Sequence, residues 1–395
     1  MSPLWWQHES HTVLDDDILC DGQSLTALAR EHGTPLYVYS RSNVQRRLQR
    51  MQEALQAAGV RHRIYYAMKS NRHPAVLQAV RGCAGVGIDA CSPREVQLAL
   101  ASGFVAADIS FNAGMLSSRD LDFLAGTGVH CTLDTFSALR RYAARAAPGT
   151  AVGLRFNSGV RVGYSDDPRL TYGGAKFGFE ADDLPRILEV VAELGLRADA
   201  VHMHLGWGLT DSGEAKVRTA FERLAAIARA VPGIEAINVG GGLGGHYVEH
   251  DHPLALGTWA ALIASVLAPV GACIWCEPGT FVSASSGMLV VEANTVETRR
   301  GETWLGVNAG FAVNLNPAMY NIGLTAIALQ QPRAEASQRY TIAGNINESG
   351  DIFGRGIALP EMREGDLLAF FPAGAYGASM ASDHCLRGGA MEIAV

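Results

Sequence analysis

Four short motifs carry side chains of the kinds that do covalent and acid–base chemistry. They contain Lys69 in AMKSN, His204 in HMHLG, a glycine run at residues 240–245, and Glu277 in CEPG. Taken alone, three of them have an ordinary explanation. The lysine can simply be solvated, the histidines can be hydrogen-bonded or form a metal site, and the glycines can serve a tight turn. A glycine run can also leave backbone N–H groups free to bind a phosphate.

In combination, the four motifs match the needs of pyridoxal 5'-phosphate. Lys69 can form a Schiff base with the aldehyde of that cofactor, and the loop of Gly240, Gly241 and Gly242 can bind its phosphate. His204 offers a flat ring to lie against the pyridine, and Glu277 a carboxylate that keeps the pyridine nitrogen protonated. We therefore predict pyridoxal 5'-phosphate as the cofactor, and no metal.

The motifs follow apolar runs that are typical of buried strands. Amphipathic segments with apolar residues three or four apart, such as DDLPRILEVVAELG, lie between these runs. Alternation of strand and helix indicates a parallel sheet, and eight units favour a (β/α)8 TIM-type barrel with functional groups at its carboxyl-terminal mouth. The expected strands are 63–70, 85–92, 109–114, 131–135, 151–157, 198–206, 236–242 and 273–279.

After residue 283 the pattern changes to strands and turns without helices between them, as in MLVVEANTVETRR and DLLAFFPAG. The fold class we expect is therefore α/β plus β, a barrel followed by a β domain. We predict an N-terminal segment 1–35 that joins the β domain, a cofactor-binding barrel at 36–282, and a C-terminal β domain at 283–395.

The composition excludes several classes of protein. The chain has 395 residues, 48% hydrophobic and 18% charged, with a net charge of −7, so it is neither disordered nor basic enough to suggest nucleic-acid binding. Its apolar runs are too short to span a membrane, and residues 1–17 lack the order of a signal peptide. Seven scattered cysteines without zinc-like spacing suggest a reduced, cytoplasmic protein.

The motifs and their order resemble those of the fold-type III pyridoxal-phosphate decarboxylases, which include diaminopimelate and ornithine decarboxylases. YAMKSN, GIDACSPREVQLAL, AKFGF, HMHLG, GGG and EPG resemble the family's barrel motifs. NPAMY, NESGD and GAYGASMASDH resemble its C-terminal motifs. The resemblance implies an alanine racemase-like fold, an amino-acid substrate, and a homodimer whose active sites are shared between subunits.

The resemblance also implies a role for individual residues. Lys69 would carry the cofactor, His204 would stack on its ring, and Glu277 would pair with the pyridinium. The other cofactor-binding positions would be Asp89, Arg155, Gly240, Gly241, Gly242, Gly279 and Tyr376. Glu348 and Asp351, in NESGD, belong to the segment that would cross to the partner subunit.

Four positions depart from the family pattern. The cysteine that helps to protonate the product is Asn347, two substrate- or phosphate-binding arginines are Thr280 and Asn316, and a serine near the phosphate is Trp207. Asn347 cannot act as an acid near neutral pH, so water, Lys69 or another residue must return the proton. The implied catalytic set is Lys69, His204, Glu277, Asn347 and Glu348, and the implied substrate-binding set is Trp207, Thr280, Asn316, Tyr320, Asn347 and Glu348.

Loss of two arginines removes bidentate carboxylate recognition. We therefore expect an amino acid or amino-acid conjugate other than diaminopimelate, of the kind used in siderophore or antibiotic biosynthesis. Two alternatives stay open: a racemase or epimerase that uses the same cofactor, and a regulatory homologue that binds the cofactor without turnover.

Overall fold

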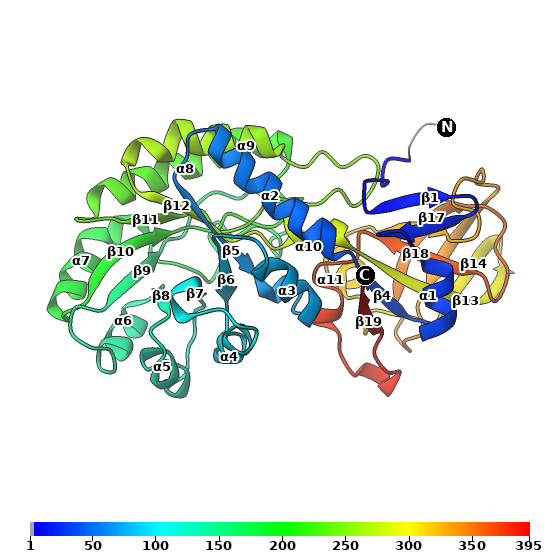
Figure 1. Ribbon diagram of the computed structural model, residues 1–395, viewed down its shortest axis with the longest axis horizontal. Coiled ribbons are helices and arrows are strands. Elements are labelled where there is room, and N and C mark those ends of the chain that lie inside the picture. The colour runs from blue at the N-terminus through cyan, green and yellow to red at the C-terminus, as the bar shows by residue number, and fades with distance from the viewer. Residues whose placement is uncertain (1–3) are drawn as a thin grey trace.

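The computed structural model describes residues 4–395, so the first three residues of the expected segment 1–35 lie outside it. Figure 1 shows a group of strands surrounded by helices beside a smaller body built mainly of strands, in which the strands β1, β4 and β19 from near the two ends of the chain lie. Among residues 4–395, no helix is long and apolar enough to cross a membrane.

Eight parallel strands close into a barrel in the order β10-β11-β12-β5-β6-β7-β8-β9, which confirms the expected (β/α)8 architecture. Every expected run extends past the carboxyl end of the observed strand, because the chain leaves the ladder there to shape the loops at the mouth. The strands are β5 (His62–Ala67), β6 (Val86–Ala90), β7 (Ile109–Asn112), β8 (His130–Leu133), β9 (Ala151–Arg155), β10 (Arg197–His202), β11 (Ala236–Asn238) and β12 (Cys273–Cys276).

Five of the helices around the barrel, α2 to α6, begin at a side-chain cap. In α4, the Ser92 hydroxyl accepts the Glu95 N–H at 3.1 Å, the Glu95 carboxylate accepts the Cys91 N–H at 2.7 Å, and Pro93 opens the helix. This cap sets the turn that directly follows β6. The helices are α2 (Arg41–Ala57), α3 (Pro74–Arg81), α4 (Pro93–Ala101), α5 (Ser118–Ala125), α6 (Phe136–Ala143), α7 (Leu184–Glu193), α8 (Glu214–Ala230) and α9 (Leu256–Leu262).

The second body is an eight-stranded sheet with the path β15-β18-β13-β14-β16-β17, to which β4 adds beside β13 and β19 adds beside β4. Its strands are β4 (Leu36–Tyr39), β13 (Gly287–Arg299), β14 (Glu302–Val307), β15 (Thr325–Ala328), β16 (Gln338–Ala343), β17 (Ile352–Leu359), β18 (Leu367–Phe371) and β19 (Met391–Ala394). Two short helices, α10 (Thr280–Ser283) and α11 (Asn316–Tyr320), lie before β13 and β15.

The N-terminal segment packs on this sheet. It contains β1 (His11–Leu14), β2 (Asp17–Cys20), β3 (Gln23–Ser24) and α1 (Leu25–His32). Its buried side chains Ile18 and Leu25 share one apolar cluster with Val38 and Val290 of the sheet. β4 pairs with β13, so residues 36–39, which we assigned to the barrel, lie in the sheet.

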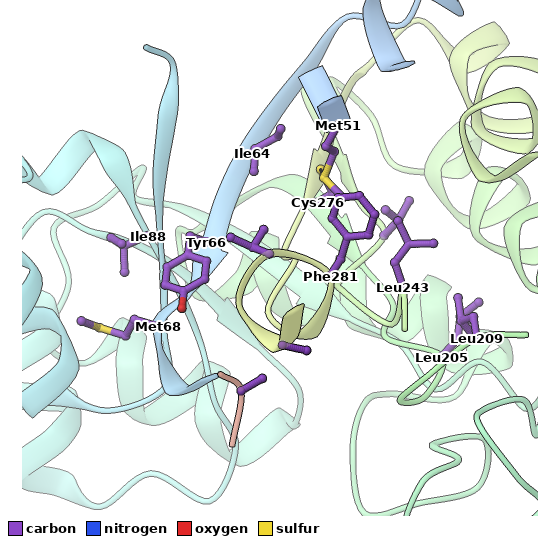
Figure 2. Packing of buried hydrophobic residues seen from close by; sticks show 14 of the residues in the cluster. Met51, Ile64, Tyr66, Met68, Ile88, Leu205, Leu209, Leu243, Cys276 and Phe281 are labelled. Carbon is purple, nitrogen blue, oxygen red and sulfur yellow. Dashed lines mark hydrogen bonds between the residues drawn. The ribbon is translucent and has the colours of Figure 1, made fainter. Parts of the chain in front are cut away.

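One apolar core continues from the barrel into the sheet, and it includes both Ile274 and Leu289. In Figure 2, Met51 of α2 lies beside Cys276 of β12 and Phe281 of α10 in this core. Met51 Sδ is 4.0 Å from Cys276 Sγ. This packing holds the end of β12, and therefore the residue that follows it, in a fixed position.

Candidate active site

A cavity of about 410 Å³ opens at the carboxyl ends of the barrel strands. Parallel strands that all end at one mouth bring together residues that are far apart in the sequence. Most of the expected site residues line it: Lys69, Arg155, His204, Trp207, Gly241, Gly242, Glu277, Gly279, Thr280, Asn316, Tyr320 and Tyr376.

Lys69 lies in the turn that follows β5. Its Nζ is 2.9 Å from Asp89 Oδ2 and 3.1 Å from Cys91 Sγ, both supplied by the end of β6. Burial opposes the charge, but Asp89, with smaller contributions from Cys91, Tyr376 and Glu277, outweighs this effect, and together they hold the pKa of Lys69 well above its ordinary value. The amine is thus fixed as a donor at the base of the cavity.

Glu277 follows β12 and is held by side chains from other strands. Its Oε1 accepts Asn238 Nδ2 at 2.7 Å, and its Oε2 lies 3.2 Å from His202 Nε2. Burial alone would protonate this carboxyl, but His202, Lys69 and Asn238 together hold the pKa of Glu277 well below its ordinary value. Burial lowers the pKa of His202, so we take the ring as neutral. Its Nε2 then carries the proton donated to the carboxylate, which requires the Asn112 side-chain amide, 2.8 Å from Nε2, to present its oxygen and not its nitrogen to the ring.

The glycine loop after β11 presses directly against His204. The Gly241 N–H donates to His204 Nδ1 at 3.2 Å, and a Cβ on Gly240, where φ is +67°, would lie 2.7 Å from that nitrogen. A Cβ on Gly241 would come within 2.4 Å of the Glu277 carbonyl oxygen. Only glycine fits here, and burial keeps the His204 ring neutral by placing its pKa well below the ordinary value.

These residues fit the cofactor that the motifs imply. An ionised, buried carboxylate matches a protonated pyridine nitrogen, and a neutral imidazole presents a flat surface beside it. Gly241, Gly242 and Gly279 border the cavity without side chains, and a Cβ on Gly279 would lie 2.9 Å from the Tyr376 hydroxyl oxygen. Close backbone approach of this kind is what phosphate binding by N–H groups requires, although the Gly240 and Gly241 N–H groups here donate to Asn238 Oδ1 and His204 Nδ1, at 2.9 and 3.2 Å. Within residues 4–395, no group of three potential ligands is arranged to hold a metal.

The positions that depart from the family pattern line another part of the wall. Thr280 and Asn316 are buried and neutral, and the Asn316 amide is within 3.5 Å of the Ala375 carbonyl oxygen. Trp207 packs against Tyr164 and Tyr247, with ring centroids 5.5 and 5.3 Å apart. The departures therefore make an aromatic, uncharged surface.

Four expected residues do not line the cavity: Asp89 and Gly240 lie behind Lys69 and His204, which do line it, and two others lie elsewhere in the fold. Asn347 and Glu348 are exposed in the loop between β16 and β17, where Glu348 Oε1 lies 3.4 Å from His384 Nε2. The Asp351 carboxylate accepts the Phe311 and Ile346 N–H groups and so shapes this loop.

Several lining residues escaped the sequence analysis. Cys91, Tyr172, Lys176 and Phe177 lie inside or beside motifs that we had identified, but their types alone did not mark them. Arg169 comes from the long loop after β9, where the sequence shows no pattern. His202, which lies behind the lining, was noted in the HMHLG motif, but the sequence analysis assigned no role to it.

Comparison with known proteins is consistent with this geometry. Residues 41–284 match the family model described as "Pyridoxal-dependent decarboxylase, pyridoxal binding domain". The diaminopimelate decarboxylase of Methanothermobacter thermautotrophicus is 32% identical, with 96% of this chain and 90% of the relative covered. That of Pseudomonas aeruginosa is 31% identical, with 98% and 94% covered.

Among solved structures, diaminopimelate decarboxylase from Helicobacter pylori, complexed with L-lysine, superimposes with a TM-score of 0.85 at 26% identity, with 94% of this chain and 93% of that chain covered. The decarboxylase interpretation, and not the racemase or the non-catalytic alternative, is thereby confirmed. The chain belongs to the fold-type III pyridoxal-phosphate decarboxylases, and it is a pyridoxal-dependent amino-acid decarboxylase.

Proposed function

We propose that this decarboxylase acts on an amino acid other than meso-diaminopimelate, with a larger or differently functionalised side chain. The observation that carries the proposal is the uncharged wall of Trp207, Thr280 and Asn316 in the cavity. A distal ammonium–carboxylate pair would find no arginine at the two positions where the family provides one. The changed wall is also our reason to propose a role in specialised biosynthesis, such as that of a siderophore or an antibiotic.

Charged groups elsewhere in the cavity do not replace those arginines directly. Arg169 is engaged with Asp167, at 2.5 Å between Nη2 and Oδ2, and also contacts the Met319 carbonyl oxygen. Lys176 Nζ lies 5.3 Å from the centroid of the Phe177 ring. A lysine offers a point charge and not the two parallel hydrogen bonds of a guanidinium.

We assign the cofactor to the residues around the mouth. Lys69 would hold its aldehyde carbon, Gly240, Gly241 and Gly242 its phosphate, and Glu277 a proton on its ring nitrogen. Bound pyridoxal phosphate supplies an electron sink for the pair left behind when CO2 departs. Asp89 keeps the Lys69 amine charged and aimed at the cavity, and the His204 ring excludes water from one face.

Proton return falls to Lys69 in this proposal. An asparagine at 347 has no acidic proton near neutral pH, whereas the Lys69 ammonium is directly at the cavity.

We also propose a homodimer with shared active sites. Asn347 and Glu348 are exposed in the single chain, and a second copy could bring them to a neighbouring cavity. Mixing a Lys69→Ala protein with a Glu348→Ala protein should then restore part of the activity through hybrid dimers. A fully active monomer in solution would contradict this part of the proposal.

A panel of L- and D-amino acids tests the substrate, with CO2 release and optical rotation as the two measurements. We expect CO2 release with one or more large side chains and negligible release with meso-diaminopimelate. Efficient turnover of meso-diaminopimelate would refute the proposed substrate class.

Borohydride reduction followed by peptide mapping tests the role of Lys69. Lys176 lines the same cavity and serves as the internal control. The adduct should map to Lys69 alone, and an adduct on Lys176 would overturn the assignment.

A further inference from the structure

Three neighbouring strands carry a row of polar side chains below the mouth of the barrel; two are buried, and the third, His130, is 19% exposed. Asp89 on β6 pairs in register with Ser110 on β7, which pairs in register with His130 on β8. Each has one buried atom without a hydrogen-bond partner among the described residues: Asp89 Oδ1, Ser110 Oγ and His130 Nδ1. Such atoms are rare because each is costly, so three on adjacent strands indicate a common partner.

All three side chains face the interior of the barrel. The His130 ring lies 5.1 Å from that of Trp275 on β12, which is opposite β8 in the closed ring of strands. Ser110 precedes by two residues Asn112, whose side chain reaches across to His202 at 2.8 Å. Alternate residues of a strand share a face, so Ser110 points inward too.

The row has a connection at each end. At the mouth, Asp89 Oδ2 accepts a hydrogen bond from Lys69. Toward the opposite face, His130 Nε2 lies 2.8 Å from Asp199 Oδ1, and Asp199 Oδ2 lies 3.6 Å from an Arg197 side chain that is 49% exposed. Polar groups thus extend from the cavity lysine to solvent at the amino-terminal end of the strands.

We propose that ordered water molecules bridge Asp89, Ser110 and His130. These waters and the three side chains, together called the file, resupply protons to Lys69 from the amino-terminal face of the barrel. A water site needs two to four polar partners, and three unpaired atoms of suitable type are present. The two ring nitrogens of His130 point to different partners, Nε2 to Asp199 and Nδ1 toward the interior, which suits this side chain to a relay. Ser110 and His130 act through Asp89 and touch neither substrate nor cofactor, so they are positioning residues.

The reaction creates the need for such a route. For each turnover, RCH(NH3+)COO− and one H+ give RCH2NH3+ and CO2: the bond from Cα to the carboxyl carbon breaks, and the remaining electron pair takes the proton. Lys69 must therefore regain one proton from solvent for every CO2 released. This inference rests on the proposed role of Lys69 as the group that returns the proton.

Crystallography and kinetics test the two parts separately. A high-resolution crystal structure of the unmodified holoenzyme should show water within hydrogen-bond distance of at least two of the three atoms. This measurement requires no substrate, so a failure of the proposed substrate class would not be mistaken for a failure of the file. Absence of water between these atoms would overturn the proposal.

The kinetic test uses Ser110→Ala, with the best substrate from the panel. We expect kcat to fall about tenfold with KM unchanged, the effect of one lost hydrogen bond. Protons would then have to enter through the mouth, so kcat of the variant should rise with buffer concentration at fixed pH and ionic strength. Ser110→Thr keeps the hydroxyl and should restore buffer independence.

Cys131→Ala is the matched control for loss of stability, because Cys131 is buried on β8, directly after His130 and in register with Phe111, but interacts with Tyr142 of the helix layer. It should leave kcat independent of buffer. If Ser110→Ala retains the kcat and buffer independence of the unmodified enzyme, or if it changes kcat without any buffer dependence, the file delivers no protons and the proposal fails.

Discussion

Replacing His202 with phenylalanine should raise the pKa of Glu277, and so make the negative charge of this carboxylate less stable. His202 is fully buried and its Nε2 lies 3.2 Å from Glu277 Oε2, so the ring can donate to the carboxylate without competition from bulk solvent. Phenylalanine keeps the shape and apolar contacts of the ring but removes the N–H donor. Asn238, at 2.7 Å, would remain as the second donor.

A hydrogen bond to a charged group contributes about 1.5–3 kcal/mol, and each 1.4 kcal/mol is a factor of ten, so kcat/KM should fall about 10- to 150-fold. The same energy corresponds to a rise of about one to two units in the pKa of Glu277. Because a protonated Glu277 cannot pair with a pyridinium, the acidic limb of the pH profile should move to higher pH.

The assay is kcat/KM for CO2 release across the acidic range, with the folded state of each variant checked by thermal unfolding. His202→Gln supplies an amide N–H at a similar distance and should recover most of the activity. Unchanged kcat/KM and an unshifted acidic limb in a folded His202→Phe protein would refute this reasoning. So would a His202→Gln protein that is as impaired as the phenylalanine variant.

Three other expectations follow from the site and the N-terminal segment. The double variant Thr280→Arg and Asn316→Arg should depress turnover of the best panel substrate, because two long charged side chains would enter a buried, neutral wall; unchanged kcat/KM would contradict this. Gly241→Ala should reduce cofactor affinity about 5- to 150-fold, since its Cβ would lie 2.4 Å from the Glu277 carbonyl oxygen and such overpacking costs about 1–3 kcal/mol; absorbance of the bound cofactor during titration measures it. Burial lowers the pKa of His8 to about 4, so between pH 6.5 and 4 the unfolded chain binds the extra proton and stability falls as pH falls. The melting temperature should therefore drop from pH 7 to pH 5, and His8→Gln should show a smaller drop.

The sequence predicted the barrel well where strands and amphipathic helices alternate regularly. It was less accurate at the ends of the strands and at the boundary of the barrel. Each of the eight barrel strands lies where an apolar run indicated it, but the runs continue past the strand ends. Residues such as Ser70 and Gly242 are as compatible with a strand as with a loop, and only the closure of the ladder decides where pairing stops. Residues 36–39 pair with β13, a partner about 250 positions away that no local pattern could identify.

The chemistry of the site can be inferred from the amino-acid sequence. A lysine, a glycine run and a carboxylate, each after an apolar run, must meet at one mouth once parallel strands form, because such strands all end on the same side. Lys69, Gly241 and Glu277 do meet there.

The hydrogen bonds that set the charge of those groups, and the residues around them, could be known only from the folded structure. The donation of His202 to Glu277 and the file through Ser110 and His130 depend on which side chains face each other across the barrel interior. The exposure of Glu348, outside the cavity of its own chain, depends on the path of the β domain. These are contacts between strands distant in sequence, and their distances arise only when the barrel closes.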